Sequence, residues 1–72
     1  MPSYSAHARK RMKERKITED EVTTALNRQS GPPAPGDNGN IVRFGHCGSR
    51  ILKIVLSADE QTVISVMPVG EE

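Results

Sequence analysis

A segment rich in Pro and Gly near the middle of the chain separates two different hydrophobic patterns. Residues 31–40, GPPAPGDNGN, contain three Gly and three Pro in ten positions, a composition that interrupts both helices and strands. Before this segment the apolar residues recur at helical spacing, and after it they alternate with polar residues. A chain of 72 residues is too short for two cores. We therefore expect a single domain over residues 1–72, with a loop at 31–40.

Two helices are expected before the loop. Residues 5–16 are rich in good helix formers and contain no Gly or Pro, and their narrow apolar stripe predicts a helix that rests lightly on the domain. Residues 18–29 begin with the pattern of a capping box, in which Thr18 accepts from the Glu21 N–H and the Glu21 side chain reaches back. The sequence thus predicts a basic helix at 5–16 and a second helix at 18–29.

Three strands are expected after the loop, within residues 41–67. The connectors between them are short enough for hairpins, which favours an antiparallel meander. Pro68 is expected to end the last strand, leaving a frayed tail at 68–72. The predicted fold class is α+β, with two N-terminal helices packed on a three-stranded antiparallel meander in the order ααβββ.

The alternation of side chains along each strand predicts the two faces of this sheet. The face expected to meet the helices consists of Val42, Phe44, Leu52, Ile54, Leu56, Ile64 and Val66. The opposite face is expected to carry Arg43, Lys53 and Ser65, flanked by Ile41, Ile51, Val55, Val63 and Met67. Two cations near the centre of a half-open face predict a concave surface that can hold a ligand.

The basic residues are concentrated at the start of the chain. The net charge is +1, but residues 1–16 hold six Lys and Arg against Glu14 alone, whereas residues 17–72 hold four cations against eight acids. A basic segment of this kind is a candidate contact for phosphates, because each cation that meets a phosphate releases condensed counterions. The alternative is a solvated helix face that keeps a small protein in solution.

His7, Arg11 and Arg15 are spaced four residues apart and therefore project from one side of the first predicted helix. Guanidinium groups match two phosphate oxygens at once, and an imidazole can take or give a proton near neutral pH. These are the groups needed for metal-independent RNA cleavage, in which the ribose 2′-hydroxyl attacks its own phosphate. The alternative is that His7 caps or packs at the helix start and the arginines are solvated.

His46 and Cys47 are the other residues whose side chains could take part in a reaction or bind a metal. His46 is a candidate second acid or base that complements His7, and the alternative is a local hydrogen bond beside its turn. Cys47 is expected to be structural, since one Cys and two His without Cys-x-x-Cys spacing do not form a typical zinc site. Asp37 and Asp59 lie in separate predicted turns, so no acidic cluster suggests a divalent metal, and no phosphate-loop pattern is present. We therefore expect no metal and no cofactor.

Residues 5–22, SAHARKRMKERKITEDEV, resemble the opening of a small bacterial family catalogued as domain of unknown function four-two-five-eight. Its members begin with a His-Ala-x-x-Arg-Met-x-x-Arg-x-Ile helix, followed by a second helix with an acidic cap. Residues 50–56 and 62–66 are similar to the closing strands of the family. The resemblance implies a relation to the RelE/barnase-like fold of small ribonucleases and toxins, some of which are paired with an antitoxin.

Carried over by position, the resemblance implies that His7, Arg11 and Arg15 are signature residues of the family. Lys16 stands where many members have Gly, a difference that bears on how the first helix ends. The variable loop that the family commonly has before its sheet fits the segment 31–40.

Two functions remain open at this point. The first is a toxin-like, metal-independent endoribonuclease or RNA-binding protein of a bacterial toxin–antitoxin system, with RNA and an antitoxin as partners. In that interpretation the catalytic residues are His7, Arg11 and His46, and the RNA-binding residues are Arg9, Arg15, Arg43 and Lys53. The second is a non-catalytic interaction module whose basic helix docks on a protein or nucleic acid, which the near-zero net charge favours. The longest apolar run is three residues, too short to span a membrane, so a cytoplasmic location is expected.

Overall fold

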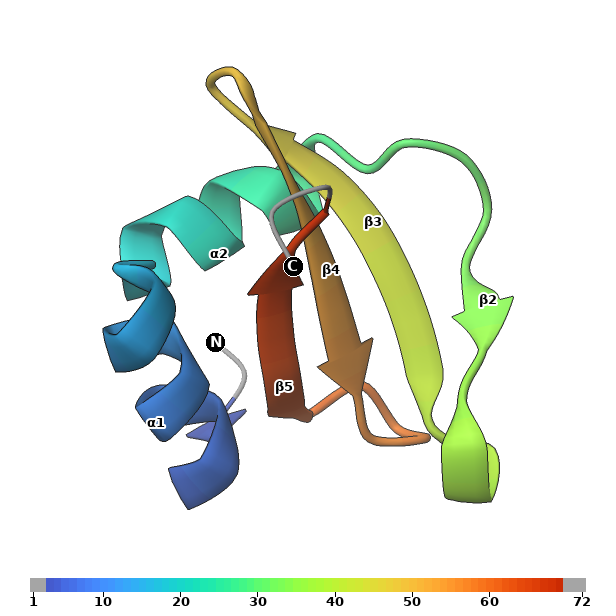
Figure 1. Cartoon of the computed structure of the whole chain (residues 1–72). Coiled ribbons are helices and arrows are strands. Elements are labelled where there is room, and N and C mark those ends of the chain that lie inside the picture. Colours follow the sequence, from blue (N-terminus) through green and yellow to red (C-terminus); the bar gives the residue numbers. More distant parts are fainter. Residues whose placement is uncertain (1–2, 70–72) are drawn as a thin grey trace.

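Two helices lie against one face of a five-stranded sheet in the computed structural model, which describes residues 3–69 (Figure 1). The elements in chain order are β1 (Ser3–Tyr4), α1 (Ala6–Arg15), α2 (Glu19–Asn27), β2 (Ala34–Pro35), the 3₁₀ helix η1 (Asp37–Gly39), β3 (Ile41–Cys47), β4 (Arg50–Leu56) and β5 (Thr62–Pro68). The predicted α+β class and both predicted helices are confirmed. Neither helix is long and apolar enough to cross a lipid bilayer.

Helix α1 is fixed to the sheet at its first turn. The Ser5 hydroxyl accepts the Ala8 N–H and donates to the Ile64 carbonyl oxygen, both at 3.0 Å. At the other end Lys16 adopts a left-handed conformation, with φ 57° and ψ 46°, and its N–H donates to the Lys13 carbonyl. The helix therefore stops at Lys16 and the chain turns directly into α2.

Helix α2 begins with the predicted capping box. The Thr18 hydroxyl accepts from the Glu21 N–H at 3.2 Å, and the Glu21 carboxylate accepts from the Thr18 N–H at 2.9 Å. Ile17, just before the cap, and Val22, in the first turn, are both buried. This start was predictable because all of its signals lie within six consecutive residues.

The sheet has the strand order β1-β5-β4-β3-β2. The central β3-β4-β5 meander is antiparallel, as predicted. Two edge strands of two residues each correct the prediction of three strands: β1 pairs parallel with β5, and β2 pairs antiparallel with β3. The segment predicted as a loop at 31–40 thus contains both β2 and η1. Strands this short carry no periodicity that a sequence pattern can reveal.

One hydrophobic core lies between the helices and the sheet. Helix α1 packs on β5, and α2 packs on β3 and β4. The buried cluster consists of Ala8, Met12, Ile17, Val22, Ala25, Leu52, Ile54, Leu56, Val63 and Val66. The face of the sheet that carries Leu52 and Ile54 is therefore the face that the helices cover, and we call the opposite one the open face.

The side chains of β3 point to the faces opposite to those predicted. Gly45 lies opposite Leu52 and Arg43 lies opposite Ile54, and cross-strand neighbours share a face. Arg43 and Gly45 therefore point to the helix side, and the prediction that Val42 and Phe44 meet the helices was wrong. The reason is the contact of α2 with Gly45, where a side chain would overlap the Ala25 main chain. Close packing here requires the residue without a Cβ.

Strand β5 contains a bulge that the sequence pattern did not predict. Ser65 pairs with Val55 and Val63 pairs with Leu56, which leaves Ile64 as an extra residue. Because one extra residue reverses the alternation, Val63 is fully buried and Ile64 is only half-buried. The expectation that Ile64 lies in the core and Val63 on the open face was wrong.

The last strand runs past the point at which a frayed tail was predicted. Pro68 pairs with Leu52 inside the sheet, and the Val69 N–H donates to the Ile51 carbonyl oxygen at 2.8 Å. The remainder of the predicted tail, residues 70–72, lies outside the described residues.

Candidate functional site

The surface of α1 gathers most of the basic side chains of the protein. The helix buries only Ala8 and Met12, and its remaining side chains are exposed or half-buried. The exposed cations at this helix are Arg9, Lys10, Lys13 and Lys16, and the half-buried ones are Arg11 and Arg15. The predicted helix that rests lightly on the domain is confirmed, and its basic side chains point into solvent.

Two of these cations have acidic partners. Arg9 contacts Glu19 at 2.8 Å, and Arg11 contacts Glu14 at 3.6 Å. Both pairs are largely exposed, and exposed ion pairs contribute little to stability and exchange readily with other partners. Within residues 3–69 no ion pair involves the cations Lys10, Lys13, Arg15 and Lys16. The helix surface therefore keeps an excess of positive charge.

Tyr4 anchors the start of α1 and orients Arg9. Its ring packs against the core, and the Arg9 guanidinium carbon lies 5.4 Å from the ring centroid. Burial raises the pKa of the Tyr4 phenol, and the nearby Glu19 carboxylate raises it further. Arg9 thus has two protein neighbours, the ring of Tyr4 and the carboxylate of Glu19. These two contacts hold the Arg9 side chain near the start of α1.

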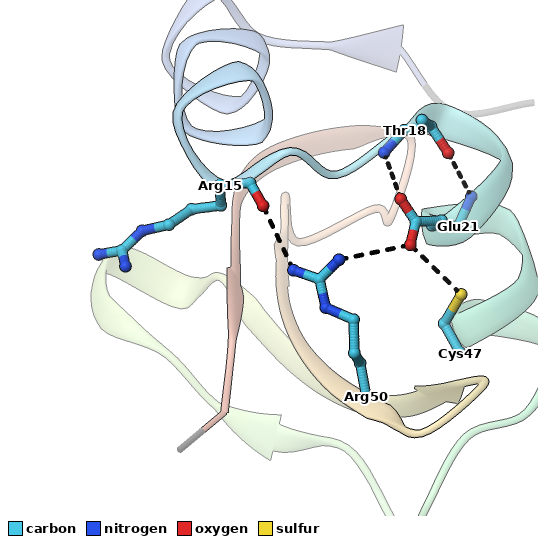
Figure 2. A network of polar contacts seen from close by, with 5 residues as sticks. All are labelled: Arg15, Thr18, Glu21, Cys47 and Arg50. Atoms are coloured by element: carbon cyan, nitrogen blue, oxygen red, sulfur yellow. Dashed lines mark hydrogen bonds and ion pairs between the residues drawn. The ribbon is translucent and has the colours of Figure 1, made fainter. Parts of the chain in front are cut away.

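The predicted row of His7, Arg11 and Arg15 lies on an exposed helix surface. His7 is exposed in the first turn and has no hydrogen-bond partner within the described part of the chain. Arg11 lies one turn further along but pairs with Glu14. The Arg15 guanidinium extends away from the neighbouring polar network in Figure 2. These three groups are reachable from solvent, but the described contacts do not join them into one anion pocket.

Arg43 and Lys53 lie on opposite faces of the sheet, so the prediction that they share a face was wrong. Arg43 is on the helix side, where it donates to the Glu60 carboxylate and to the Gln29 side chain. Its pairing with Glu60 raises the pKa of Arg43 and lowers the pKa of Glu60. Lys53 lies opposite Phe44 on the open face. Arg43 is thus held by two polar side chains of the protein, whereas Lys53 has no such partner within the described residues.

The two histidines are also separated. His46 is exposed and lies opposite Ile51, which places it on the open face near the tip of the β3–β4 hairpin. In Figure 1 this tip is at the top, whereas α1 begins at the bottom and covers the other face. His7 therefore cannot act together with His46, or with Lys53, on one phosphodiester within a single chain.

A polar network that the sequence did not predict joins the α1–α2 junction to the β3–β4 hairpin (Figure 2). The Glu21 carboxylate accepts from Arg50 at 3.4 Å and lies 3.9 Å from the Cys47 sulfur. Arg50 also donates to the Arg15 carbonyl oxygen at 3.3 Å. Cys47 is half-buried and packs against the core, which fits a structural role. The capping box was the only part of this network with a local sequence signal.

A depression of about 290 Å³ lies on the open face, beneath the segment that contains β2 and η1. Its lining residues are Pro35, Gly36, Asp37, Asn40, Val42, Lys53 and Val55. The β2 segment accounts for the burial of Val42, which is 8% exposed although it faces away from the helices. Lys53 and Asp37 both line the depression, and no ion pair joins them.

Metal ligands do not gather in the described part of the chain. Within residues 3–69 no three His, Cys, Asp or Glu side chains are placed so that they could hold a metal ion.

A family model matches residues 4–68, from Tyr4 to the end of β5, and its description is Domain of unknown function (DUF4258). The matched range includes both helices and the complete β3-β4-β5 meander. No curated protein and no solved structure matches the chain significantly.

Proposed function

This chain belongs to the family Domain of unknown function (DUF4258), and we propose that it is an RNA-binding protein that contacts the phosphate backbone through α1. The observation that carries the proposal is the surface of this helix. Lys10, Lys13, Arg15 and Lys16 are solvent-accessible there, and none of them has an ion pair within residues 3–69. Cations in this state release the counterions of a polyanion at little cost, because no internal pair has to break first.

The resemblance to RelE/barnase-like small ribonucleases directs the proposal to RNA rather than to another polyanion. Two helices on one face of a sheet with an antiparallel β3-β4-β5 meander support a relation to that fold. A role in a bacterial toxin–antitoxin system, with an antitoxin as second partner and a cytoplasmic location, belongs to the same proposal. A protein with a small net charge can still bind RNA if its cations are concentrated on one surface.

Endoribonuclease activity is a second candidate, because His7 is exposed one turn before Arg11. In this reaction the His7 imidazole takes the proton of a ribose 2′-hydroxyl, and the oxygen attacks the adjacent phosphorus. The bond to the 5′-oxygen breaks, water supplies the proton of the leaving group, and the products are a 2′,3′-cyclic phosphate and a 5′-hydroxyl. Arg11 and Arg15 would stabilise the charge on the phosphoryl oxygens.

Binding is tested by fluorescence anisotropy with a labelled single-stranded RNA over a range of salt concentrations. We expect the affinity of the wild type to fall steeply with salt and Lys13→Glu to weaken binding while it reduces the salt slope by about 1. Lys53→Glu, which makes the same charge change on the open face, is the matched control and should bind like the wild type. Equal losses in the two variants, or no binding at low salt, would contradict the proposal.

Cleavage is tested with the same RNA in the presence of EDTA. If the protein is an endoribonuclease, the wild type yields fragments with 2′,3′-cyclic phosphate ends, and His7→Ala and Arg11→Ala do not. RNA binding without cleavage would identify a non-catalytic module. Absence of both would point to a protein partner that docks on α1.

A further inference from the structure

The open face of the sheet carries a contiguous set of side chains that neither helix covers. The strand register places Phe44, Lys53 and Met67 in one row across β3, β4 and β5. In the next row His46 lies opposite Ile51. Val69 continues this row beside Ile51, because the Val69 N–H donates to the Ile51 carbonyl oxygen. The open-face patch consists of Phe44, His46, Ile51, Lys53, Met67 and Val69.

Two large hydrophobic side chains of the patch, Ile51 and Val69, are exposed. Ile51 is 37% exposed and Val69 is 42% exposed, and within residues 3–69 these are the two exposed large hydrophobic residues. Single exposed apolar residues are common on protein surfaces and carry no information. Here the two are neighbours, and the half-buried Phe44 and Met67 continue the apolar area next to them. A contiguous apolar area of this kind is typical of an interaction site.

Lys53 is the one formally charged residue of the patch. Lys53 lies in its central row between Phe44 and Met67, and within the described residues its ammonium group has no hydrogen bond or ion pair. His46 lies in the adjacent row, and none of the six residues is acidic. A partner that covers the apolar side chains removes water from Lys53, which is unfavourable unless the partner supplies a carboxylate.

We propose that the open-face patch docks an acidic amphipathic segment of a partner protein. The apolar side chains of the segment contact Ile51, Val69, Met67 and Phe44, and one of its carboxylates pairs with Lys53. The depression beneath β2 shares Lys53 with the patch, but Asp37 and Asn40 also line it, so the proposed contact is confined to the patch. This site is separate from α1 and does not rest on the proposed RNA binding.

The same observations disfavour two other occupants. A second copy of this chain, docked face to face about a two-fold axis, would place basic residues against basic residues. A sheet face that binds the bases of single-stranded RNA offers several aromatic rings on which they stack, whereas the patch has one phenyl ring, that of Phe44, and is otherwise aliphatic or basic. A protein segment with aliphatic side chains and a carboxylate matches both the apolar side chains and the charge of the patch.

The proposal is tested by selection from a displayed library of random peptides of helical length, with the wild-type protein as bait. We expect the enriched peptides to be acidic and to have apolar residues at helical spacing. Their affinity should fall about tenfold or more for Lys53→Glu and for Ile51→Ser, two substitutions outside the buried core, and circular dichroism checks that both variants are folded. Lys13→Glu on α1 is the matched control and should leave peptide binding unchanged while it weakens RNA binding.

A charge exchange makes the test more specific. Versions of the enriched peptides with Lys in place of their acidic residues should prefer the Lys53→Glu variant over the wild type. The proposal is overturned if no peptide is enriched, if the enriched peptides are neutral or basic, or if their binding survives Lys53→Glu. It is also overturned if Ile51→Ser abolishes a dimer of this chain, or if Lys53→Glu abolishes RNA binding.

Discussion

Gly45 of β3 lies so close to Ala25 of α2 that a Cβ atom on Gly45 would be 1.9 Å from the Ala25 carbonyl oxygen. Because that atom belongs to the main chain, a rotamer change cannot relieve the overlap, and α2 would have to shift. We therefore expect Gly45→Ala to lower the free energy of unfolding by about 3 kcal/mol or more, a large part of the stability of a small domain. Urea denaturation measures this loss.

Gly31→Ala is the matched control for Gly45→Ala. Gly31 also gains a methyl group, but no atom lies within 4 Å of the new Cβ, and the cost comes only from its φ of +79°. That cost is about 1–2 kcal/mol. Equal losses in the two variants would show that α2 does not rest on β3 as closely as described.

Lys16 is a position where a substitution should increase stability. It ends α1 in the left-handed region, with φ 57°, and its side chain is exposed. Glycine adopts this conformation without the clash that a Cβ introduces. We expect Lys16→Gly to raise the free energy of unfolding by about 1 kcal/mol, or the midpoint of thermal unfolding by roughly 4–8 °C. Lys13→Gly, inside the helix, should instead lower stability by about 1 kcal/mol, and a loss in both would contradict the prediction.

Glu21 and Glu19 allow a comparison within the first turn of α2. Both interact with the positive end of the helix dipole, but Glu21 also completes the capping box and pairs with Arg50. Glu19 makes only the exposed ion pair with Arg9. We expect Glu21→Ala to cost about 1–2 kcal/mol and Glu19→Ala less than about 0.5 kcal/mol. Chemical denaturation of both variants checks the difference, and similar losses would contradict it.

The pair of Glu60 and Arg43 makes stability depend on pH. Hydrogen bonding to Arg43 lowers the pKa of Glu60 below its ordinary value of 4.5 in the folded state, so folding favours the ionised carboxylate. The stabilisation is therefore present above that ordinary pKa and is lost as the pH falls through the lower, folded value. We expect Glu60→Gln to be less stable than the wild type at neutral pH and to lose less stability on acidification.

Thermal unfolding of the wild type and Glu60→Gln between neutral and strongly acidic pH measures this difference. Asp59 also has a lowered pKa, because Ser57 and the Gln61 N–H bond to its carboxylate. It contributes equally in both proteins and cancels from the comparison. Parallel curves for the two proteins would show that Glu60 contributes nothing to the acid dependence.

The sequence was informative where the signal is local. The capping box at Thr18 and Glu21 needs four consecutive residues, and the alternation along β4 predicted that Leu52, Ile54 and Leu56 are buried. In each case neighbouring residues alone determine the outcome. The basic surface of α1 was predictable for the same reason, since its apolar stripe is too narrow to bury more of the helix.

The faces of β3 and β5 depended on contacts between distant residues. Gly45 has no side chain and therefore contributes nothing to a hydrophobic pattern. Its contact with Ala25 nevertheless determines which side of β3 meets the helices. The bulge at Ile64 is visible only in the pairing of β5 with β4. The contact at Gly45 places Arg43 on the face opposite to Lys53, and the bulge turns Val63 into the core. The predicted site, which combined Arg43 and Lys53 with His7, is therefore not formed.

The attachment of α1 to β5 through Ser5 and Ile64 has a consequence for protein synthesis. Helix α1 is translated before α2, β3 and β4, whereas β5, the strand that it covers, is translated after them. The contacts among α2, β3 and β4 join segments that follow one another in the sequence and do not depend on α1. The basic helix α1 can therefore dock on the sheet only after β5 has been made, and until then its cations have no sheet beneath them.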